Sequence, residues 1–151
     1  MDISTLVEIE KIRQLKARYF RTMDQKDWPA WEQVFTKNVL IDTTQEGSPL
    51  INSRQEFRDF LPPMLEGVKT VHHGHTSEIT LTGPYSATGI WAMEDNLWWP
   101  KSAGGGHFWG TGWYFEKYEK QENEEWLIAE LVLRRIRVEM NGKQTFPPVN
   151  S

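Results

Sequence analysis

The sequence predicts an α+β domain in which a curved, mixed but mostly antiparallel β-sheet wraps into a cone around three N-terminal α-helices. Two periodicities carry this prediction. Apolar residues recur at steps of three and four in the N-terminal part, as in a helix, and at steps of two from residue 68 onward, as in strands. A chain of 151 residues suits one such domain. We expect it to cover residues 1–142, followed by a C-terminal tail at 143–151.

Three helices are expected before the main sheet. The first covers residues 5–23, because one helical face carries a run of apolar side chains. These are Leu6, Ile9, Ile12, Leu15, Tyr19 and Met23. A second, short helix begins near Pro29, a residue that suits the first helical turn. The third helix follows the capping-box spacing of Ser53 and Glu56, and we expect the Pro62–Pro63 pair to end it.

The remaining periodic segments are predicted strands. They lie at residues 39–43, 68–81, 86–99, 107–120 and 125–138. Turn-forming residues separate the long strands, most plainly Gly83–Ser86 and the glycine-rich run 101–106, so strands that follow one another in the chain should pair. One face of so long a sheet must be buried, and the only helices precede it. The sheet should therefore curl around those helices and leave one open mouth.

Composition excludes several function classes. The net charge is −4 and the basic residues are scattered among acidic ones, which argues against a nucleic-acid partner. The absence of cysteine removes disulfides, thiolate metal ligands and thiol nucleophiles. Because no apolar run is long enough for a membrane span or a signal segment, we expect a soluble, cytoplasmic protein without a membrane partner. Eight tryptophans and seven phenylalanines suit a ligand pocket or an interface.

Two polar residues near the end of the first helix are candidate site residues. Asp24 stands at the helix C-terminus, where the helix dipole disfavours an anion, so its position needs compensation. Tyr19 lies just over one turn earlier on the core-facing side, and its hydroxyl needs a polar partner if it is buried. Each has an ordinary alternative: Asp24 as a turn residue that hydrogen-bonds its own backbone, and Tyr19 as core packing.

Three of the four histidines fall within Val71–His75, on a predicted strand. Side chains alternate along a strand, so His72 faces one side of the sheet and His73 and His75 face the other. A β-bulge would exchange those faces, which leaves the choice between His72 and His73 open. His73 and His75 also fit a metal pair, with Glu78 close behind as in a cupin, but a stable site needs further ligands. We expect no metal.

Asp95 interrupts an apolar face of its predicted strand. The other residues on that face are Trp91, Met93, Leu97 and Trp99. A carboxylate buried among them needs a cation or a histidine as a partner. The last strand offers Arg134 and Arg135, and which of the two faces inward depends on the strand register.

Four segments, which follow one another along nearly the whole chain, match the pattern of a known family. They are Arg18-Tyr19-Phe20 with Asp24, Thr70-Val71-His72-His73-Gly74-His75, Trp91-Ala92-Met93-Glu94-Asp95, and Trp126 with Ile128 followed by Arg134-Arg135. Together they resemble the SnoaL-like family of the nuclear transport factor two-like superfamily, most closely its bile-acid dehydratase and scytalone dehydratase branches. The resemblance implies the cone fold, also described as a cystatin-like α+β barrel, and chemistry without a cofactor.

The resemblance also implies a catalytic set. By position its members are Tyr19, Asp24, His72, Asp95 and Arg135. We expect acid/base chemistry on a small hydrophobic polycyclic, polyketide-like or steroid-like molecule. The enzyme would be a lyase that eliminates water, or a double-bond isomerase or cyclase.

Large side chains that alternate on two predicted strands are expected to line an aromatic chamber for this substrate, although such a stripe is also typical of ordinary core. The expected lining residues are Trp91, Met93, Trp109, Trp113 and His73. Exposed aromatic strands should also pair subunits into a homo-oligomer, either a dimer or a trimer. Two alternatives stay open: a non-catalytic ligand-binding or assembly module with the same cone, and a metal-dependent cupin-like enzyme.

Overall fold

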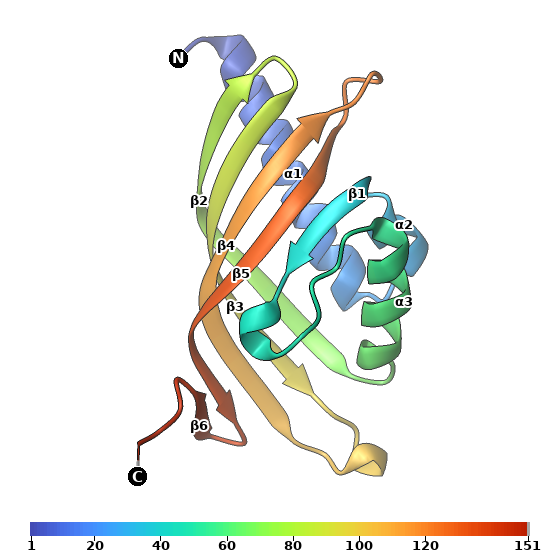
Figure 1. Cartoon of the computed structure of the whole chain (residues 1–151), viewed down its shortest axis with the longest axis vertical. Coiled ribbons are helices and arrows are strands. Elements are labelled where there is room, and N and C mark those ends of the chain that lie inside the picture. Colours follow the sequence, from blue (N-terminus) through green and yellow to red (C-terminus); the bar gives the residue numbers. More distant parts are fainter. Residues whose placement is uncertain (151) are drawn as a thin grey trace.

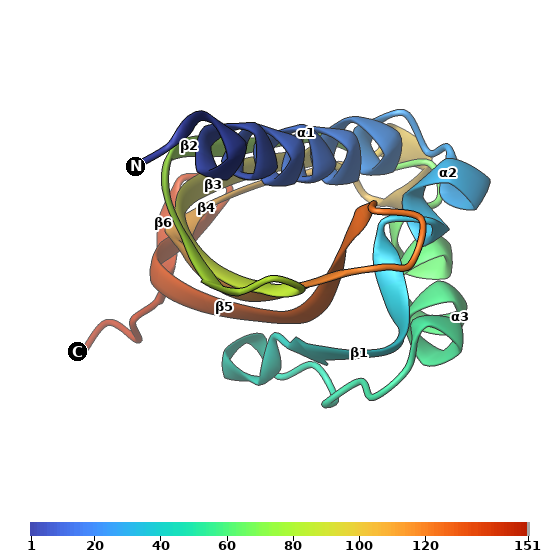
Figure 2. The same ribbon diagram turned by 90° about the horizontal axis from the view of Figure 1, so that it is seen from above.

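Helix α1 lies across the open side of a strongly curved sheet in the computed structural model, which describes residues 1–150 (Figure 1, Figure 2). The helices are α1 (Ile3–Asp24), α2 (Trp28–Glu32) and α3 (Arg54–Leu65), with short 3-10 turns η1 (Thr44–Glu46) and η2 (Lys101–Ala103). The strands are β1 (Phe35–Asp42), β2 (Lys69–Gly83), β3 (Ser86–Trp98), β4 (His107–Lys120), β5 (Trp126–Met140) and β6 (Lys143–Phe146).

The sheet is mixed but mostly antiparallel. Its order is β1-β5-β4-β3-β2, and β6 also pairs with β5. The four long strands β2 to β5 pair antiparallel in chain order, whereas β1 joins β5 in parallel. β1 and β2 remain sheet edges, so the sheet curls without closing into a barrel. This confirms the predicted α+β cone of three helices on a curved sheet.

The apolar stripe of α1 forms the helical side of the core. The carboxylate of Asp2 caps the helix by accepting the Thr5 backbone N–H at 2.9 Å. From Ile9 to Met23 the predicted apolar face is buried, as the period of the sequence requires. Trp31 packs behind it, with ring centroids 5.0 Å from Phe35 and 4.8 Å from Phe57, and joins α2 and α3 to β1.

Two sequence expectations about segment ends need correction. α3 continues through Pro62 and Pro63 to Leu65, because both prolines lie in the last part of the helix and the burial of Phe57 and Leu65 holds it in place. The expected tail at 143–151 is not free at its start, since Lys143–Phe146 forms β6 against β5. Ser151 lies outside the described residues.

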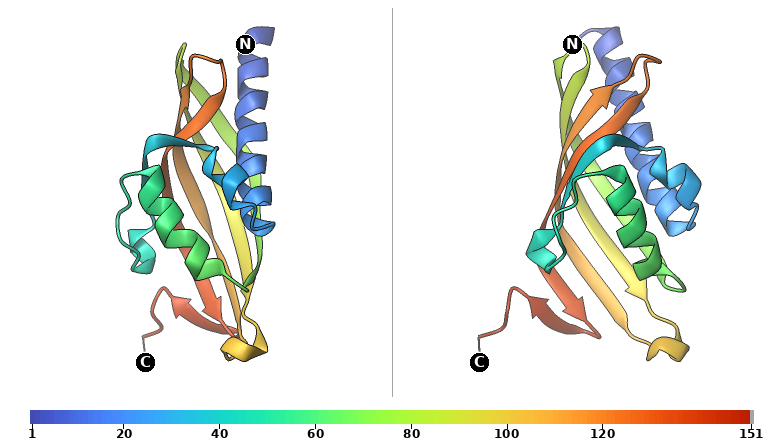
Figure 3. Two further views of the ribbon diagram at one scale, coloured as in Figure 1. Left: turned by 90° about the vertical axis from the view of Figure 1, so that its right-hand side faces the viewer. Right: turned by 45° about the vertical axis from the view of Figure 1, so that its right-hand side comes forward.

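The C-terminal halves of β3 and β5 and the N-terminal half of β4 extend beyond the C-terminal end of α1 (Figure 3). Near this end η1 lies beside β5, where Gln45 and Glu46 contact Arg135. We call the region around Gln45, Glu46, Phe108 and Val138 the mouth. None of the helices within residues 1–150 has the length and apolar character needed to cross a membrane.

Candidate active site

Asp24 and His72 form the central pair of the site. Asp24 is the last residue of α1, and its Oδ1 lies 2.7 Å from Nδ1 of His72 on β2. Its Oδ2 accepts the backbone N–H of His72 at 2.9 Å. An ionised carboxylate can only accept, so Nδ1 carries a proton, and Nε2 is the ring nitrogen that can give up or take up the other one. The side chains are 23% and 9% exposed, so the pair is shielded but reachable.

A short hydrogen-bond chain supports Asp24 from behind. Thr70, which shares the inner face of β2 with His72, donates its hydroxyl to Oδ1 of Asp24 at 2.8 Å. Lys26 donates from Nζ to the Thr70 hydroxyl at 2.8 Å. These contacts provide the compensation that an anion at a helix C-terminus requires. The sequence pattern does not point to either residue, because the turn after α1 and the start of β2 meet only in three dimensions.

Asp95 lies opposite His72 on the neighbouring strand β3. Its Oδ2 is 3.7 Å from Nε2 of His72, which is an electrostatic contact rather than a hydrogen bond. Asp95 is buried, and it binds both terminal nitrogens of the Arg135 guanidinium, at 2.7 Å and 3.0 Å. This fork-shaped pairing with Arg135 supplies the cation that the sequence predicts beside the buried carboxylate.

Strand register decides between the alternative residues on β2 and β5. His72 pairs with inward-facing Asp95, whereas His73 pairs with Glu94 on the outer face. On β5, a bulge opposite Thr111 and Gly112 brings Arg135 inward. Arg134 points away and binds Asp42 on β1 at 3.1 Å. His72 rather than His73, and Arg135 rather than Arg134, therefore lie next to Asp95.

Glycine on β4 makes room for this ion pair. Gly110 lies opposite Asp95, and a Cβ added there would lie 2.5 Å from Nη1 of Arg135 and 3.0 Å from Oδ1 of Asp95. Any larger residue at this position would push the guanidinium away from the carboxylate. The signal in the sequence is the pair of glycines, Gly110 and Gly112, at alternate positions of an otherwise aromatic strand.

Tyr19 projects from α1 into the same interior. It is buried, and its ring packs edge-on against Tyr114 of β4 with centroids 6.2 Å apart. Burial raises the pKa of the Tyr19 hydroxyl, and the nearby charges of Glu116, Asp95 and Asp24 raise it further. The hydroxyl therefore stays protonated at neutral pH and can act only as a neutral hydrogen-bonding group.

A buried ion pair lies beneath the two tyrosines. Nζ of Lys16 is 2.6 Å from Oε2 of Glu116, and both side chains are fully buried. The ammonium also lies 3.8 Å from the ring centroid of Tyr19 and 3.7 Å from that of Tyr114. Burial lowers the pKa of Lys16 to about 8, although Glu116 opposes the shift. The clue in the sequence is a lysine on the apolar face of the first helix.

Trp91 and Met93 lie on the inner face of β3, as expected. The indole N–H of Trp91 donates to the Tyr118 hydroxyl at 2.9 Å, and that hydroxyl donates to Glu116 at 2.7 Å. Trp91 therefore belongs to the buried network around Lys16. Met93 is buried beside Arg135, with its sulfur 3.5 Å from Nη1.

Trp109 and Trp113 do not lie on the inner face of the sheet with Trp91 and Met93. The register pairs Asp95 with Gly110, so the odd-numbered residues of β4 face outward. Trp109 lies opposite Asn96, and Trp113 is 40% exposed. The expectation that these two tryptophans share a chamber with Met93 is wrong, because alternation within one strand does not reveal its register against the next.

His73 also lies on the outer face, away from the inward pair of Asp24 and His72. Its Nδ1 is 3.8 Å from a carboxylate oxygen of Glu94, and Nε2 of His75 is 3.3 Å from the same oxygen. His73 therefore does not face Met93 and Asp95, but it lines a surface hollow of about 460 Å³ together with His72 and Trp91. Within residues 1–150, no three His, Cys, Asp or Glu side chains are arranged to hold a metal ion. The cupin alternative also requires a fold that this chain does not have.

Arg135 also contacts the residues of the mouth. Nε of Arg135 donates to Glu46 of η1 at 2.6 Å, and its backbone N–H donates to the side chain of Gln45 at 2.5 Å. A cavity of about 260 Å³ opens here, with Phe108 and Val138 among its walls. The sequence pattern does not point to Gln45 or Glu46, because they lie in a turn without periodicity.

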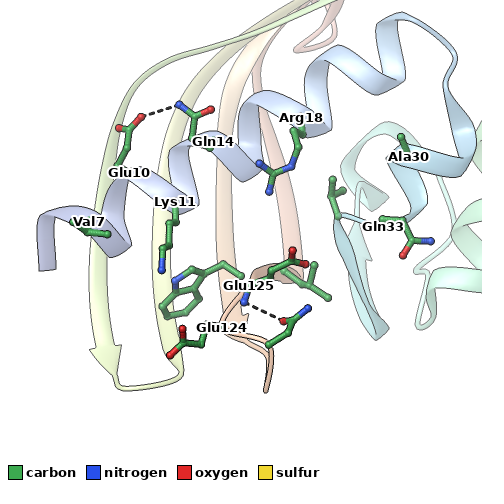
Figure 4. A pocket seen from close by; sticks show the side chains of 13 residues that line it. Val7, Glu10, Lys11, Gln14, Arg18, Ala30, Gln33, Glu124 and Glu125 are labelled. Atoms are coloured by element: carbon green, nitrogen blue, oxygen red, sulfur yellow. Dashed lines mark hydrogen bonds between the residues drawn. The ribbon is translucent and has the colours of Figure 1, made fainter. Parts of the chain in front are cut away.

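A separate hollow lies along α1. It is a groove of about 870 Å³ between α1 and the turn that joins β4 to β5 (Figure 4). Lys11 and Arg18 project from α1 toward that turn, which carries Glu124 and Glu125 (Figure 4). Tyr19, Asp24, His72, Asp95 and Arg135 are not among its lining residues. The groove is therefore separate from the candidate site.

Comparison with known proteins identifies the family of this chain. The family model described as a SnoaL-like domain matches residues 4–132. The chain belongs to the SnoaL-like family. The resemblance of the motifs to the SnoaL-like family is thereby confirmed.

Several solved structures share the fold of this chain. A variant of Rv3472, a protein of unknown function from Mycobacterium tuberculosis, is 26% identical with a TM-score of 0.74, over 89% of this chain and 75% of that one. A proposed scytalone dehydratase from Novosphingobium aromaticivorans is 16% identical with a TM-score of 0.81, over 92% and 91%. A hexachlorocyclohexane dehydrochlorinase, LinA type 2, is 15% identical with a TM-score of 0.81, over 99% and 100%. The last two likenesses concern the fold.

Proposed function

We propose that this SnoaL-like chain is a cofactor-independent acid/base enzyme that eliminates water from a hydrophobic polycyclic substrate or moves a double bond within it. One observation carries the proposal: Asp24 holds Nδ1 of His72, and Nε2 faces the buried pair of Asp95 and Arg135. A base held by one carboxylate, with its reactive nitrogen directed inward, is the arrangement that general acid/base catalysis requires.

The proposed reaction needs no oxidant or reductant. Nε2 of His72 removes a proton from a carbon next to a carbonyl or conjugated system, and the electrons of that C–H bond form a new double bond. The hydroxyl on the neighbouring carbon leaves, takes the proton from His72 and departs as water. In an isomerisation, His72 instead returns the proton to a different carbon. A positioned acid/base of this kind contributes about 10²–10⁴-fold to the rate.

Tyr19 and the two carboxylates balance the charges that develop. The Tyr19 hydroxyl, kept protonated by burial, donates to the substrate oxygen that becomes negative. Asp24 and Asp95 flank the His72 ring and stabilise the imidazolium that forms. Arg135 keeps Asp95 in place through its paired hydrogen bonds.

The names of two relatives support elimination as the reaction type. A scytalone dehydratase removes water, and a hexachlorocyclohexane dehydrochlorinase removes hydrogen chloride. Apolar walls near Arg135 favour an apolar substrate body, because Phe108, Val138 and Phe146 line the cavity beside its polar residues. A polyketide-like or steroid-like alcohol or ketone fits this requirement, as in the bile-acid and scytalone dehydratase branches.

A mass-spectrometric screen of hydroxylated polycyclic ketones tests the proposal. With the wild-type protein we expect loss of one water from at least one compound, and deuterium uptake beside the carbonyl when the reaction runs in deuterium oxide. His72→Ala should abolish both signals while the unfolding midpoint stays close to that of the wild type. His73→Ala is the matched control and should keep both, because its ring lies on the outer face.

Two results would overturn the proposal. One is equal turnover by the wild type and His72→Ala, which would remove the proton-transferring role. The other is stoichiometric iron, manganese or zinc in protein purified without a histidine tag, with turnover lost on chelation and restored by the metal. That result would place the chain in a metal-dependent class.

A further inference from the structure

Arg135 binds two carboxylates, and only one of them is needed to compensate its charge. Asp95 takes both terminal nitrogens of the guanidinium, and Nε donates to Glu46 at 2.6 Å. A guanidinium is a flat fork with two edges that can each receive a carboxylate. Asp95 occupies the inner edge, so Glu46 occupies the edge that faces the mouth.

The turn that carries Glu46 is weakly anchored. η1 has three residues and no buried side chain, and it ends at Gly47 in the left-handed conformation with φ 86°. Gln45 and Glu46 hold it against β5 through their hydrogen bonds to Arg135. Because none of the side chains of η1 is buried, moving Glu46 away from Arg135 exposes no core side chain of this turn.

The space beside this edge suits an apolar acid. The polar residues that line the cavity of about 260 Å³ are Arg135, Gln45, Glu46 and Thr145, and its apolar walls are Phe108, Val138 and Phe146. The cavity is slightly smaller than typical ligand pockets, which begin near roughly 300 Å³, and departure of the Glu46 side chain would enlarge it. One guanidinium edge among apolar side chains recognises one anionic oxygen pair on an otherwise hydrophobic body.

We propose that the mouth binds the carboxylate of a hydrophobic acid at the Nε edge of Arg135, and that Glu46 occupies this position until the acid displaces it. The proposal rests on the proposed function only in treating this acid as the substrate class. In the resting state the protein's own carboxylate fills the ligand position and repels a second anion. Displacement leaves the Asp95–Arg135 pair intact, so the acid exchanges one carboxylate for another on the same guanidinium.

Binding of two matched probes tests this assignment without any turnover. The probes are 2-naphthoic acid and its neutral amide, titrated by calorimetry into the wild type and into Glu46→Gln. Removing the competing charge should tighten naphthoate binding about tenfold and leave the amide unchanged. Glu125→Gln, an exposed charge removal in the β4–β5 turn, is the control and should bind both probes as the wild type does.

The outcomes separate the ligand assignment from the proposed reaction. An unchanged naphthoate affinity in Glu46→Gln, an equal gain for acid and amide, or no saturable naphthoate binding to either protein would overturn it. Glu46→Ala is the second variant. It should also bind naphthoate more tightly and the amide unchanged, because it removes the same charge as Glu46→Gln but leaves a smaller side chain. Selective naphthoate binding by a protein that neither eliminates water nor moves a double bond would retain this inference and reject the proposed function.

Discussion

The carboxylate of Asp24 contacts His72 twice, at the backbone N–H of the strand and at Nδ1 of the ring, with distances of 2.9 Å and 2.7 Å. One residue at the end of α1 thus sets both the position of β2 and the tautomer of its histidine. A histidine ring held by a side chain alone can turn, whereas here the ring and the strand share one anchor. The helix and the strand therefore act as a single support for the base.

Asp24→Asn should lower kcat by roughly 100-fold or more, because an amide can present either a donor or an acceptor to Nδ1 and no longer selects one tautomer. The binding constant of a non-reactive substrate analogue should change far less. Steady-state kinetics and calorimetry make the two measurements. Asp59→Asn, an exposed acid on α3, is the control and should keep full activity. Wild-type kcat in the Asp24 variant would contradict the tautomer role.

Gly110→Ala should separate Asp95 from Arg135, since the new methyl would lie 2.5 Å from Nη1. We expect a loss of about 1–3 kcal/mol in the free energy of unfolding and a large fall in kcat. Gly89→Ala is a matched control: its Cβ would lie 2.6 Å from the Tyr118 hydroxyl, away from Asp95. It should lose stability and retain most of its kcat. Urea unfolding and kinetics distinguish the two, and equal kcat in both variants would refute the role of Gly110.

The buried ion pair of Lys16 and Glu116 predicts a rise in stability with pH. Burial lowers the folded-state pKa of Lys16 from 10.5 to about 8, so between these values the unfolded chain holds more protons. Below about pH 8 both states are protonated and the folded state carries the full cost of burial, which is on the order of 3 kcal/mol. The free energy of unfolding should therefore increase as pH rises from about 8 toward 10.

The reference for this measurement is the double variant Lys16→Met with Glu116→Gln, because removing only the lysine would leave an uncompensated buried carboxylate. We expect urea unfolding to show that the free energy of unfolding of the wild type, relative to that of the double variant, increases from about pH 7.5 to 9.5. Above about pH 10 the buried tyrosines, whose pKa values are raised, act in the opposite direction. A difference that is flat across the window would contradict the lowered pKa.

The outer face of the sheet predicts self-association. Trp113, Phe115 and Ile136 are 40%, 43% and 52% exposed on adjacent strands β4 and β5. We propose that this face pairs subunits into a homo-oligomer, as such apolar patches commonly do. Light scattering after size exclusion should give a dimer or a trimer for the wild type and a monomer for Trp113→Glu. Tyr85→Glu, at the exposed β2–β3 turn, should leave the assembly unchanged, and a monomeric wild type would contradict the proposal.

Periodic segments were predictable because their pattern is local. The apolar stripe from Ile9 to Met23 defines the buried face of α1, and alternation along Trp91, Met93 and Asp95 defines the inner face of β3. Asp95 was identifiable as needing a partner, because an unpaired carboxylate on an apolar face is too costly. The sequence offered two candidates for its histidine neighbour, His72 and His73, and two for its cation, Arg134 and Arg135.

The sequence by itself determined the α+β cone, its single long helix and its four long strands, together with the residue types that carry the proposed chemistry. Only the tertiary structure decided that His72 rather than His73 meets Asp24, that Arg135 rather than Arg134 meets Asp95, and that Trp113 faces outward. Alternation fixes faces within a strand, but register and bulges between strands depend on the packing of the whole sheet. For the same reason the contact between Glu46 and Arg135 belongs to the folded chain alone.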